Sequence, residues 1–506
     1  SEIEVNSLED YLNKMKENFV MLNQYERKAI IKEQCLKLAE ELGGEVQLDE
    51  DLLEEVTFIV EYPTAFYGKF DEKYLSLPTK AVITPMKQHL RYFPVTKDGK
   101  LLPNFISVRN GDSYKIENVV KGNEKVLEAR LADALFFYNE DTKKNLESYT
   151  EKLKYVVFQE KLGTIYEKSE RIGKLSEDII ELIASEKIDI DSDKLNLCKQ
   201  KALRASQLCK ADLVTGMVGE FDELQGYMGK EYAKVAGEDS DVCEAIYEHY
   251  LPRFSGDILP ESKLGCILSI ADKLDSIAGF FAVGIKPTGS QDPYALRRQA
   301  LGIVSVLIEK QIDVDFKELV LLAVNNYEYL NINKEDILND IVDFFKDRIS
   351  VQFKDNGIRY DIVDAVVNSK GNSIYDLYLR ALALNEWLKS DGMVEALTAF
   401  NRVSTLAQKS KSDIVDEYLL KEEEEKKLFE SFKGTKVEIV ELLQNKKYSE
   451  AIDVFASLKS DIDNLFDNVM IMDKDEAIKN NRLGLLKQIY DTMLGICDLS
   501  KVVYKD

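Results

Sequence analysis

The sequence predicts a mainly α-helical protein of several domains, with a smaller α+β domain in its N-terminal part. Three observations indicate this fold class. The 506 residues exceed what one hydrophobic core usually organises, so we expect three or four domains. Apolar residues recur at helical spacing over most of the chain. The clearest strand signal is a single segment with two short β-rich runs around Asp98-Gly99.

The first 145 residues combine helical patterns with this hairpin signal. Residues 8–42 and 51–60 show apolar residues at helical spacing, and a Gly-Gly pair separates the two patterns. The segment 91–111, RYFPVTKDGKLLPNFISVRNG, predicts the hairpin, and 122–141 returns to helical spacing. We therefore interpret residues 1–145 as one α+β domain with leading helices.

The remaining chain predicts helices almost throughout. Gly and Pro breaks divide it, and we place one helical domain at 146–300 and a helical body at 301–372. Residues 373–506 predict a C-terminal helical bundle. It begins with a helical hairpin whose apolar stripes are Ile374, Leu377, Ala381, Leu384 and Leu388, then Val394, Leu397, Phe400, Val403 and Leu406. The charge run KEEEEKK at 421–427 predicts a solvated helix face or linker.

The composition limits the partners and the compartment. Lys and Arg total 67 against 91 Asp and Glu, a formal net charge of −24. Such a chain resists non-specific nucleic-acid binding, so we expect no DNA partner. A local basic patch can still bind RNA, because charges beyond about 8 Å are largely screened at physiological salt. No apolar run approaches the roughly 20 residues that span a membrane. The six cysteines lack a C-x-x-C pair, which favours reduced thiols in a cytoplasmic protein.

The sequence lacks the short motifs of a self-contained enzyme. It has no G-x-x-x-x-G-K-[ST] loop, no G-x-G-x-x-G turn and no G-x-S-x-G elbow. His89 and His249 are its two histidines, which are too few for a His-rich metal site. We therefore expect no catalytic residue and no bound metal on this chain.

Two aspartates and one histidine nevertheless occur in the order found in a known superfamily. Asp212, His249 and Asp272 have an order and spacing that resemble the HD superfamily of metal phosphohydrolases. Lys210 stands in the segment where that family has its His-Asp pair, and an ammonium cannot bind a metal as a neutral imidazole does. The resemblance implies a degenerate HD-like helical domain in which these residues make internal hydrogen bonds. A metal-dependent phosphohydrolase that uses them is an alternative function.

Two adjacent arginines follow a well-specified turn in GIKPTGSQDPYALRRQALGIVSVLI, residues 284–308. Gly284 can end the preceding helix, Gly289 can adopt positive φ, and Asp292 with Pro293 is typical of a helix start. This places the two arginines early in the helix, where the helix dipole disfavours cations. We interpret Lys286, Arg297 and Arg298 as candidates for binding phosphate or a partner carboxylate. The alternative is an ion pair between these arginines and Asp272, Asp275 or a nearby Glu.

Longer motifs carry a family resemblance. ADLVTGMVGEFDELQGYMGKEYA, AIYEHYLPRFSGD, ADKLD and PTGSQDPYALRRQALG occur in the order of the bacterial glycyl-tRNA synthetase β subunit. Upstream, SLPTKAVITPMKQHLRYFPV, GNEKVLEARLADALFFYNED and VVFQEKLGTIYEK resemble the same family, so the likeness runs from about Leu53 to the end. That family begins with further sequence, including a Gly-Thr-Glu-Glu-Leu-Pro segment. We therefore expect this chain to be a C-terminal portion of such a subunit.

The resemblance implies how the work is divided. In that family the α subunit forms glycyl-adenylate with ATP and Mg, and the β subunit supplies tRNA-binding surface. An α2β2 assembly that charges tRNA(Gly), with no cofactor on this chain, is therefore implied. The resemblance also implies a B3/B4-like remainder near the hairpin, similar to one in phenylalanyl-tRNA synthetase. The C-terminal helices resemble the DALR-type anticodon-binding bundle shared with arginyl-tRNA synthetase.

Polar residues on the C-terminal helices complete the set of candidates. RNA is read at unstacked loop bases by amides, arginine planes and aromatic rings. The candidates that offer such groups are Asn401, Arg402, Lys479, Asn480, Asn481 and Arg482. The alternative is that they are ordinary surface residues of a helical interaction scaffold without an RNA role.

Overall fold

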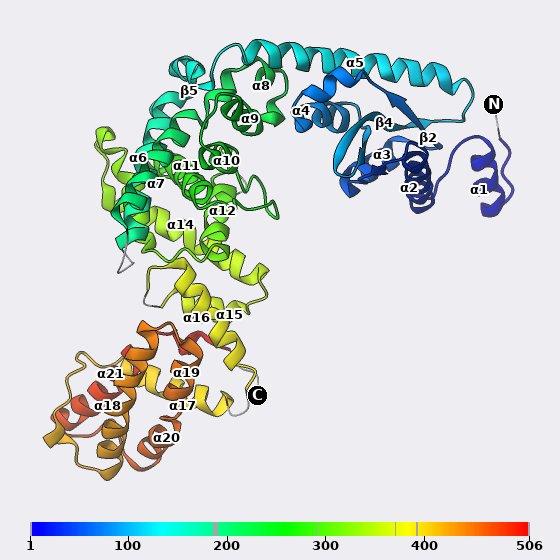
Figure 1. Cartoon of the computed structure of the whole chain (residues 1–506). Helices are drawn as coiled ribbons and strands as arrows, with labels where there is room; N and C mark the ends of the chain where they lie inside the picture. Colours follow the sequence, from blue (N-terminus) through cyan, green and yellow to red (C-terminus); the bar gives the residue numbers. More distant parts are fainter. Residues whose placement is uncertain (1–2, 186–190, 290, 370, 391–392, 504–506) are drawn as a thin grey trace. The chain divides into compact units, whose positions relative to one another are not determined.

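The structure is a computed structural model that describes residues 3–185, 191–289, 291–369, 371–390 and 393–503. It is mainly helical with a small sheet, as predicted (Figure 1). The described chain divides into two compact units. Unit 1 comprises Ser1–Gln159, Gly163–Ser169 and Arg204–Tyr247, and unit 2 comprises Glu160–Leu162, Glu170–Leu203 and Glu248–Asp506.

Unit 1 is built around a four-stranded antiparallel sheet of order β1-β3-β4-β2. Its strands are β1 (Glu45–Val46), β2 (Pro63–Lys69), β3 (Phe93–Lys97) and β4 (Lys100–Asn110). The predicted hairpin is confirmed, because Lys97 pairs with Lys100 and Asp98 and Gly99 both have positive φ, as a tight two-residue turn requires. Strands β1 and β2 were not predicted; β1 has only two residues, too few to show an alternation, and β2 begins within Glu61-Tyr62-Pro63, which marked only the end of a helix in the sequence.

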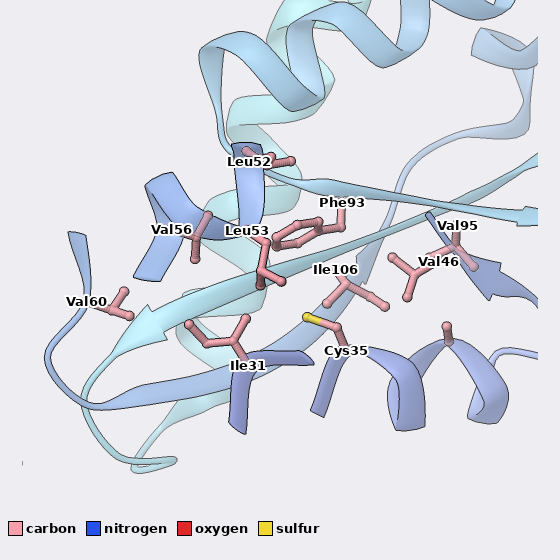
Figure 2. Close-up of a cluster of buried hydrophobic side chains, with 11 residues drawn as sticks. Ile31, Cys35, Val46, Leu52, Leu53, Val56, Val60, Phe93, Val95 and Ile106 are labelled. Atoms are coloured by element: carbon pink, nitrogen blue, oxygen red, sulfur yellow. The ribbon is translucent and has the colours of Figure 1, made fainter. Parts of the chain in front are cut away.

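Helices cover both faces of this sheet. Adjacent residues of β4 point to opposite faces, and Phe105 and Ile106 are both fully buried. Ile106 belongs to a core cluster between the sheet and the helices α2 and α3, which Figure 2 shows with Ile31, Cys35 and Leu53 converging on it. The helices of the sheet region are α1 (Leu8–Glu17), α2 (Gln24–Glu41), α3 (Glu50–Ile59), α4 (Thr79–Thr84) and α5 (Ile116–Asp141).

The rest of unit 1 consists of short elements. These are the pair β5 (Val157–Gln159) and β6 (Gly163–Thr164), then α8 (Gly216–Glu220), α9 (Tyr227–Val235) and most of α10 (Ser240–Glu248). Asp141, buried at the end of α5, fixes α8 and α9 to that helix. Its carboxylate accepts hydrogen bonds from the Gly216 N–H at 2.9 Å, the Met217 N–H at 2.8 Å and the Tyr232 hydroxyl at 2.8 Å.

Unit 2 has α11 (Lys263–Ala282) as its central helix. Residues 264–281 of this helix are all buried, which is expected of a helix packed on every side. Helices α12, α13 and α14 pack against it. The helices of this first part are α12 (Leu296–Glu309), α13 (Phe316–Asn325), α14 (Lys334–Asp355) and α15 (Tyr360–Val367). Helices α6 (Ile165–Ser185) and α7 (Ser192–Leu208) contribute residues to both units.

The C-terminal part of unit 2 is the predicted helical bundle. It comprises α16 (Ile374–Trp387), α17 (Met393–Ala407), α18 (Glu423–Gln444), α19 (Tyr448–Ala456), α20 (Lys459–Asn468) and α21 (Glu476–Met493). Both predicted apolar stripes are largely buried. The charge run at the start of α18 differs from our interpretation. Glu425 is 1% exposed and accepts backbone N–H bonds from Lys421 and Glu422, so one member of the run lies in the core.

The predicted domain boundaries at 145, 300 and 372 remain sequence predictions. The two compact units follow a different criterion, the density of internal contacts. By that criterion the predicted helical domain at 146–300 contributes to both units, whereas 301–372 and 373–506 belong to the same one.

Replacement of Leu53 by Ala should destabilise the sheet region of unit 1. Leu53 is fully buried in the core cluster, and removal of such a side chain costs about 2–5 kcal/mol. Leu36→Ala is the matched control, because Leu36 is 48% exposed on the neighbouring helix. Hydrogen exchange of β3 and β4 amides measures the loss within this unit. Equal protection of these amides in the two variants would contradict the placement of Leu53 in the core cluster.

Candidate nucleic-acid interface

The turn before the paired arginines is confirmed, but the helix begins later than predicted. Gly284 and Gly289 both have positive φ, whereas Ser290 lies outside the described residues. Helix α12 starts at Leu296, with Ala295 as its N-cap, and not directly after Asp292. Asp292 still caps this helix, because its carboxylate accepts the N–H groups of Leu296 at 2.8 Å and Arg297 at 2.9 Å.

This arrangement changes the role expected of the helix start. The Asp292 carboxylate already occupies the exposed amide end, so that end has no need of an external anion. The alternative of a structural ion pair is wrong: neither Arg297 nor Arg298 forms an ion pair with any residue that the structure describes. Asp275 pairs instead with Arg171, Nε to Oδ1 at 2.9 Å. The two adjacent arginines therefore carry uncompensated charge at the protein surface.

Exposed aromatic and apolar side chains lie on the chain segments next to these arginines. Arg298 donates a long hydrogen bond of 3.5 Å to the carbonyl of Arg253, which places the 253–258 loop beside α12. We define the Arg297 surface as Arg253, Phe254, Ile258, Tyr294, Arg297 and Arg298. Phe254 is 55% exposed and Ile258 62% exposed, while Tyr294 stacks on Phe280 with centroids 4.0 Å apart. Sequence patterns missed Phe254 and Ile258 because they lie in a Pro- and Gly-bounded loop outside any apolar stripe.

The other predicted cation in this region is neutralised. Lys286 forms an ion pair with Asp340, and its ammonium lies 6.0 Å from the centroid of the Phe281 ring. Both partners are about two-fifths exposed, so the pair is a surface interaction of little energetic value. Lys286 thus contributes less free positive charge than the two arginines.

In the C-terminal bundle, Arg402 is held against α20. Its guanidinium lies 3.7–3.8 Å from carboxylate oxygens of Asp463 and Asp467, and 4.4 Å from the centre of the Phe466 ring. The amide oxygen of Asn401 is buried and accepts no hydrogen bond from a described residue. The pair therefore combines a partly exposed arginine plane with an amide acceptor that lacks a donor.

Asn481 and Arg482 correct our prediction of RNA contacts. Both are only 5% exposed. The Asn481 amide accepts the N–H of Asp416 at 2.6 Å and donates to its carbonyl at 3.0 Å. Arg482 binds the buried Glu425 and donates to the Met470 carbonyl at 2.8 Å. These side chains serve the interior, whereas Lys479, which pairs with Glu476, and the exposed Asn480 remain candidates.

The two corrected residues lie beside a loop that the sequence did not indicate as functional. Asn481 fixes Asp416, and Gln488 donates to the Asp413 carbonyl at 2.6 Å. A Cβ on Gly484 would lie only 2.5 Å from the Ile414 carbonyl oxygen, so the loop packs closely against α21. This loop, 412–420, presents Ile414 and Tyr418 at 78% and 89% exposure.

The three HD-like positions are buried. Asp212 in unit 1 and His249 in unit 2 are fully buried, and Asp272 in unit 2 is 9% exposed. One carboxylate oxygen of Asp212 accepts the N–H groups of Gly226 at 2.6 Å and Gly229 at 3.0 Å. Burial raises the pKa of Asp212 from its usual 3.8 to about 6. Within the described chain, no three His, Cys, Asp or Glu side chains are grouped so that they could hold a metal ion.

Comparisons with known proteins decide the family. Residues 1–368 match the family model described as glycyl-tRNA synthetase beta subunit, and residues 396–501 match the DALR anticodon binding domain. The chain belongs to the family of glycyl-tRNA synthetase beta subunits. The predicted family and anticodon-binding bundle are thereby confirmed, and neither a phosphohydrolase nor a scaffold without an RNA role is favoured.

Curated relatives support this membership over the whole chain. The glycine–tRNA ligase beta subunit of Clostridioides difficile strain 630 is 64% identical over 507 residues, which cover 100% of this chain and 72% of that protein. The beta subunit of Syntrophomonas wolfei is 44% identical over 99% of this chain and 71% of its own length. That of Bacillus subtilis strain 168 is 39% identical over 100% and 72%.

Among the helices that the structure describes, none is both long and apolar enough to cross a membrane. In a glycyl-tRNA synthetase beta subunit, the Arg297 surface and the loop 412–420 are the surfaces to test for RNA binding.

Replacement of Arg482 by Met should destabilise the bundle strongly. The change leaves Glu425 charged and buried without its cation, which typically costs about 3–5 kcal/mol. Lys479→Met on the same helix should cost less than about 1 kcal/mol, because the pair with Glu476 is exposed. Urea denaturation of the two variants measures the difference. Similar losses would show that the Arg482–Glu425 pair is not buried.

Asp212→Asn should remove a pH-dependent loss of stability in unit 1. A carboxyl group whose pKa rises from 3.8 to about 6 on folding binds its proton more tightly when folded. Below pH 4 the group is protonated in both states and does not lower the free energy of unfolding. Above pH 6 it lowers the free energy of unfolding by about 3 kcal/mol, from 1.36 kcal/mol per pKa unit.

The measurement is urea denaturation of both proteins at pH 4.5 and at pH 7. Other titrating groups are common to both, so the difference between the two proteins isolates Asp212. The Asn variant should gain stability relative to the wild type as the pH rises. A difference that stays constant between the two pH values would contradict the raised pKa.

Proposed function

We propose that this chain binds tRNA(Gly) as the beta subunit of an α2β2 glycine–tRNA ligase of the cytoplasm. In this proposal the α subunit holds ATP and Mg and attaches glycine, and the present chain supplies RNA-binding surface. The Arg297 surface carries the proposal, because it joins two arginines without ion pairs to exposed aromatic and apolar side chains.

The chemistry of the Arg297 surface fits an RNA strand. Guanidinium groups bind phosphate oxygens in a bidentate manner, and aromatic faces stack on unpaired bases. Arg297 and Arg298 provide the first, and Phe254 and Tyr294 provide the second. The overall acidic charge opposes this only weakly, because it is screened beyond about 8 Å at physiological salt.

A second surface on the bundle fits the anticodon-binding role that its domain match indicates. Tyr418 is 89% exposed on a loop that Asn481 and Gln488 hold in place, so a base could stack on it at little entropic cost. Asn480, Lys479 and the partly exposed Arg402 offer polar contacts. Asn481 and Arg482 act in this proposal as positioning residues that keep the loop and helix in place.

The double variant Arg297→Ala and Arg298→Ala should weaken tRNA binding without unfolding unit 2. Each lost phosphate contact removes a counterion-release contribution, so the salt dependence should become shallower by about one to two units of slope. Filter binding of tRNA(Gly) across a salt series, with the α subunit present, measures both the affinity and the slope.

Lys143→Ala with Lys144→Ala is the matched control. These adjacent lysines are exposed in unit 1. Their replacement removes the same formal charge as the arginine double variant does. If the control weakens binding as much as the arginine variant, the effect is one of net charge and the Arg297 surface is not the RNA site. A collapsed melting temperature in the arginine variant would assign these residues a structural role instead.

A further inference from the structure

Unit 2 contains a pocket that lies apart from both surfaces described above. Its volume is about 430 Å³, within the range of about 300–1,000 Å³ that is typical of small-ligand sites. It is lined by the first turn of α13, one face of α14, the end of α15, and the loop that leads into α16. None of its lining residues belongs to the Arg297 surface or to the loop 412–420.

The floor of the pocket is apolar. Phe316, Val342 and Ile349 contribute to it, and Ile349 and Phe316 are almost fully buried. The α14 residues of the lining follow at intervals of three and four, so they project from one helix face. Such a floor favours a flat, weakly polar group over a fully hydrated ion.

The rim carries amide groups with spare hydrogen-bonding capacity. The side chain of Asn339 makes no hydrogen bond with any described residue. Asn368 donates to the Asp364 carbonyl at 3.1 Å, which leaves its side-chain oxygen as an acceptor. Amides of this kind supply both the donor and the acceptor that the polar edge of a nucleobase requires.

Two lysines give the rim a positive excess. Lys317 forms no ion pair within the described part of the chain, and Lys346 is paired with Asp343 at 2.9 Å in an exposed pair. The described lining residues therefore include two ammonium groups and one carboxylate, in a chain whose net charge is −24. An exposed pair of this type is weak, so an incoming phosphate can compete for Lys346.

We propose that this pocket binds a nucleotide, with the base on the apolar floor, its edge at Asn339 and Asn368, and its phosphate at Lys317 and Lys346. The nucleotide is either a free mononucleotide or one residue of an RNA strand, since both present the same base and phosphate. The inference does not rest on the Arg297 surface, which shares no residue with the pocket.

The test is a titration of the full chain with the four 5′-mononucleotides and with the matching nucleosides. Methyl NMR signals of Val342, Ile349 and Leu377 locate binding in the pocket, and calorimetry gives the affinity. A mononucleotide should shift these signals, and the nucleoside should bind about tenfold or more weakly because it lacks the phosphate.

Two variants and one control make the result specific. Lys317→Gln with Lys346→Gln should weaken nucleotide binding about tenfold or more, and Val342→Trp should block it by filling the floor. Lys354→Gln with Lys389→Gln is the control, because Lys354 likewise forms no ion pair with a described residue and Lys389 is in an exposed pair with Glu386. The control should bind as the unmodified chain does.

The source of the nucleotide follows from a second arm with a short single-stranded RNA and with tRNA. Methyl shifts with mononucleotides assign a free nucleotide, and shifts with RNA alone assign a residue of a strand; either supports the pocket. Absence of shifts with every probe at millimolar concentration would overturn the proposal, as would equal binding by the double lysine variant. These signals report on the pocket itself, so failure of the Arg297 surface would leave them unchanged.

Discussion

The burial of helix α11 on every side is the constraint on which the arrangement of unit 2 depends. Polar residues inside such a helix must find partners in the protein, because an unpaired buried charge is costly. Lys273 meets this need by donating to the carbonyls of His249 at 3.1 Å and Leu251 at 2.8 Å. The same bonds hold the chain that leads into the 253–258 loop, and Arg298 then contacts the Arg253 carbonyl. The Arg297 surface is thus placed by the interior of the unit.

The C-terminal bundle uses the same principle in a second place. Buried polar side chains on α21 fix an exposed loop, and the loop carries the side chains that face solvent. Asn481 satisfies both backbone groups of Asp416, and Arg482 neutralises Glu425 at the start of α18. Residue types that recognise RNA in solution, such as amides and guanidinium groups, are here used to satisfy the backbone and a buried carboxylate.

An acidic RNA-binding subunit must concentrate its positive charge locally. Many surface lysines and arginines of the described residues have carboxylate partners close by, as Lys286 has in Asp340 and Lys479 in Glu476. Arg297 and Arg298 differ in having none among the described residues, whereas Arg253 beside them is paired with Asp257 at 2.8 Å. Binding sites can therefore be distinguished by uncompensated cations beside exposed rings, and this distinction requires knowledge of every neighbouring carboxylate.

The sequence by itself determined the helical architecture, the hairpin at Asp98-Gly99 and the family. These features depend on local spacing, turn chemistry and collinear motifs, all of which a linear pattern contains. Only the tertiary structure decided which candidate side chains face solvent. Asn481 and its partner Asp416 are 65 positions apart, and Arg482 and Glu425 are 57 apart. The pocket at Lys317 and Lys346 could not be predicted from the sequence either, because its lining comes from separate helices. A residue's exposure is set by neighbours that folding brings from elsewhere in the chain.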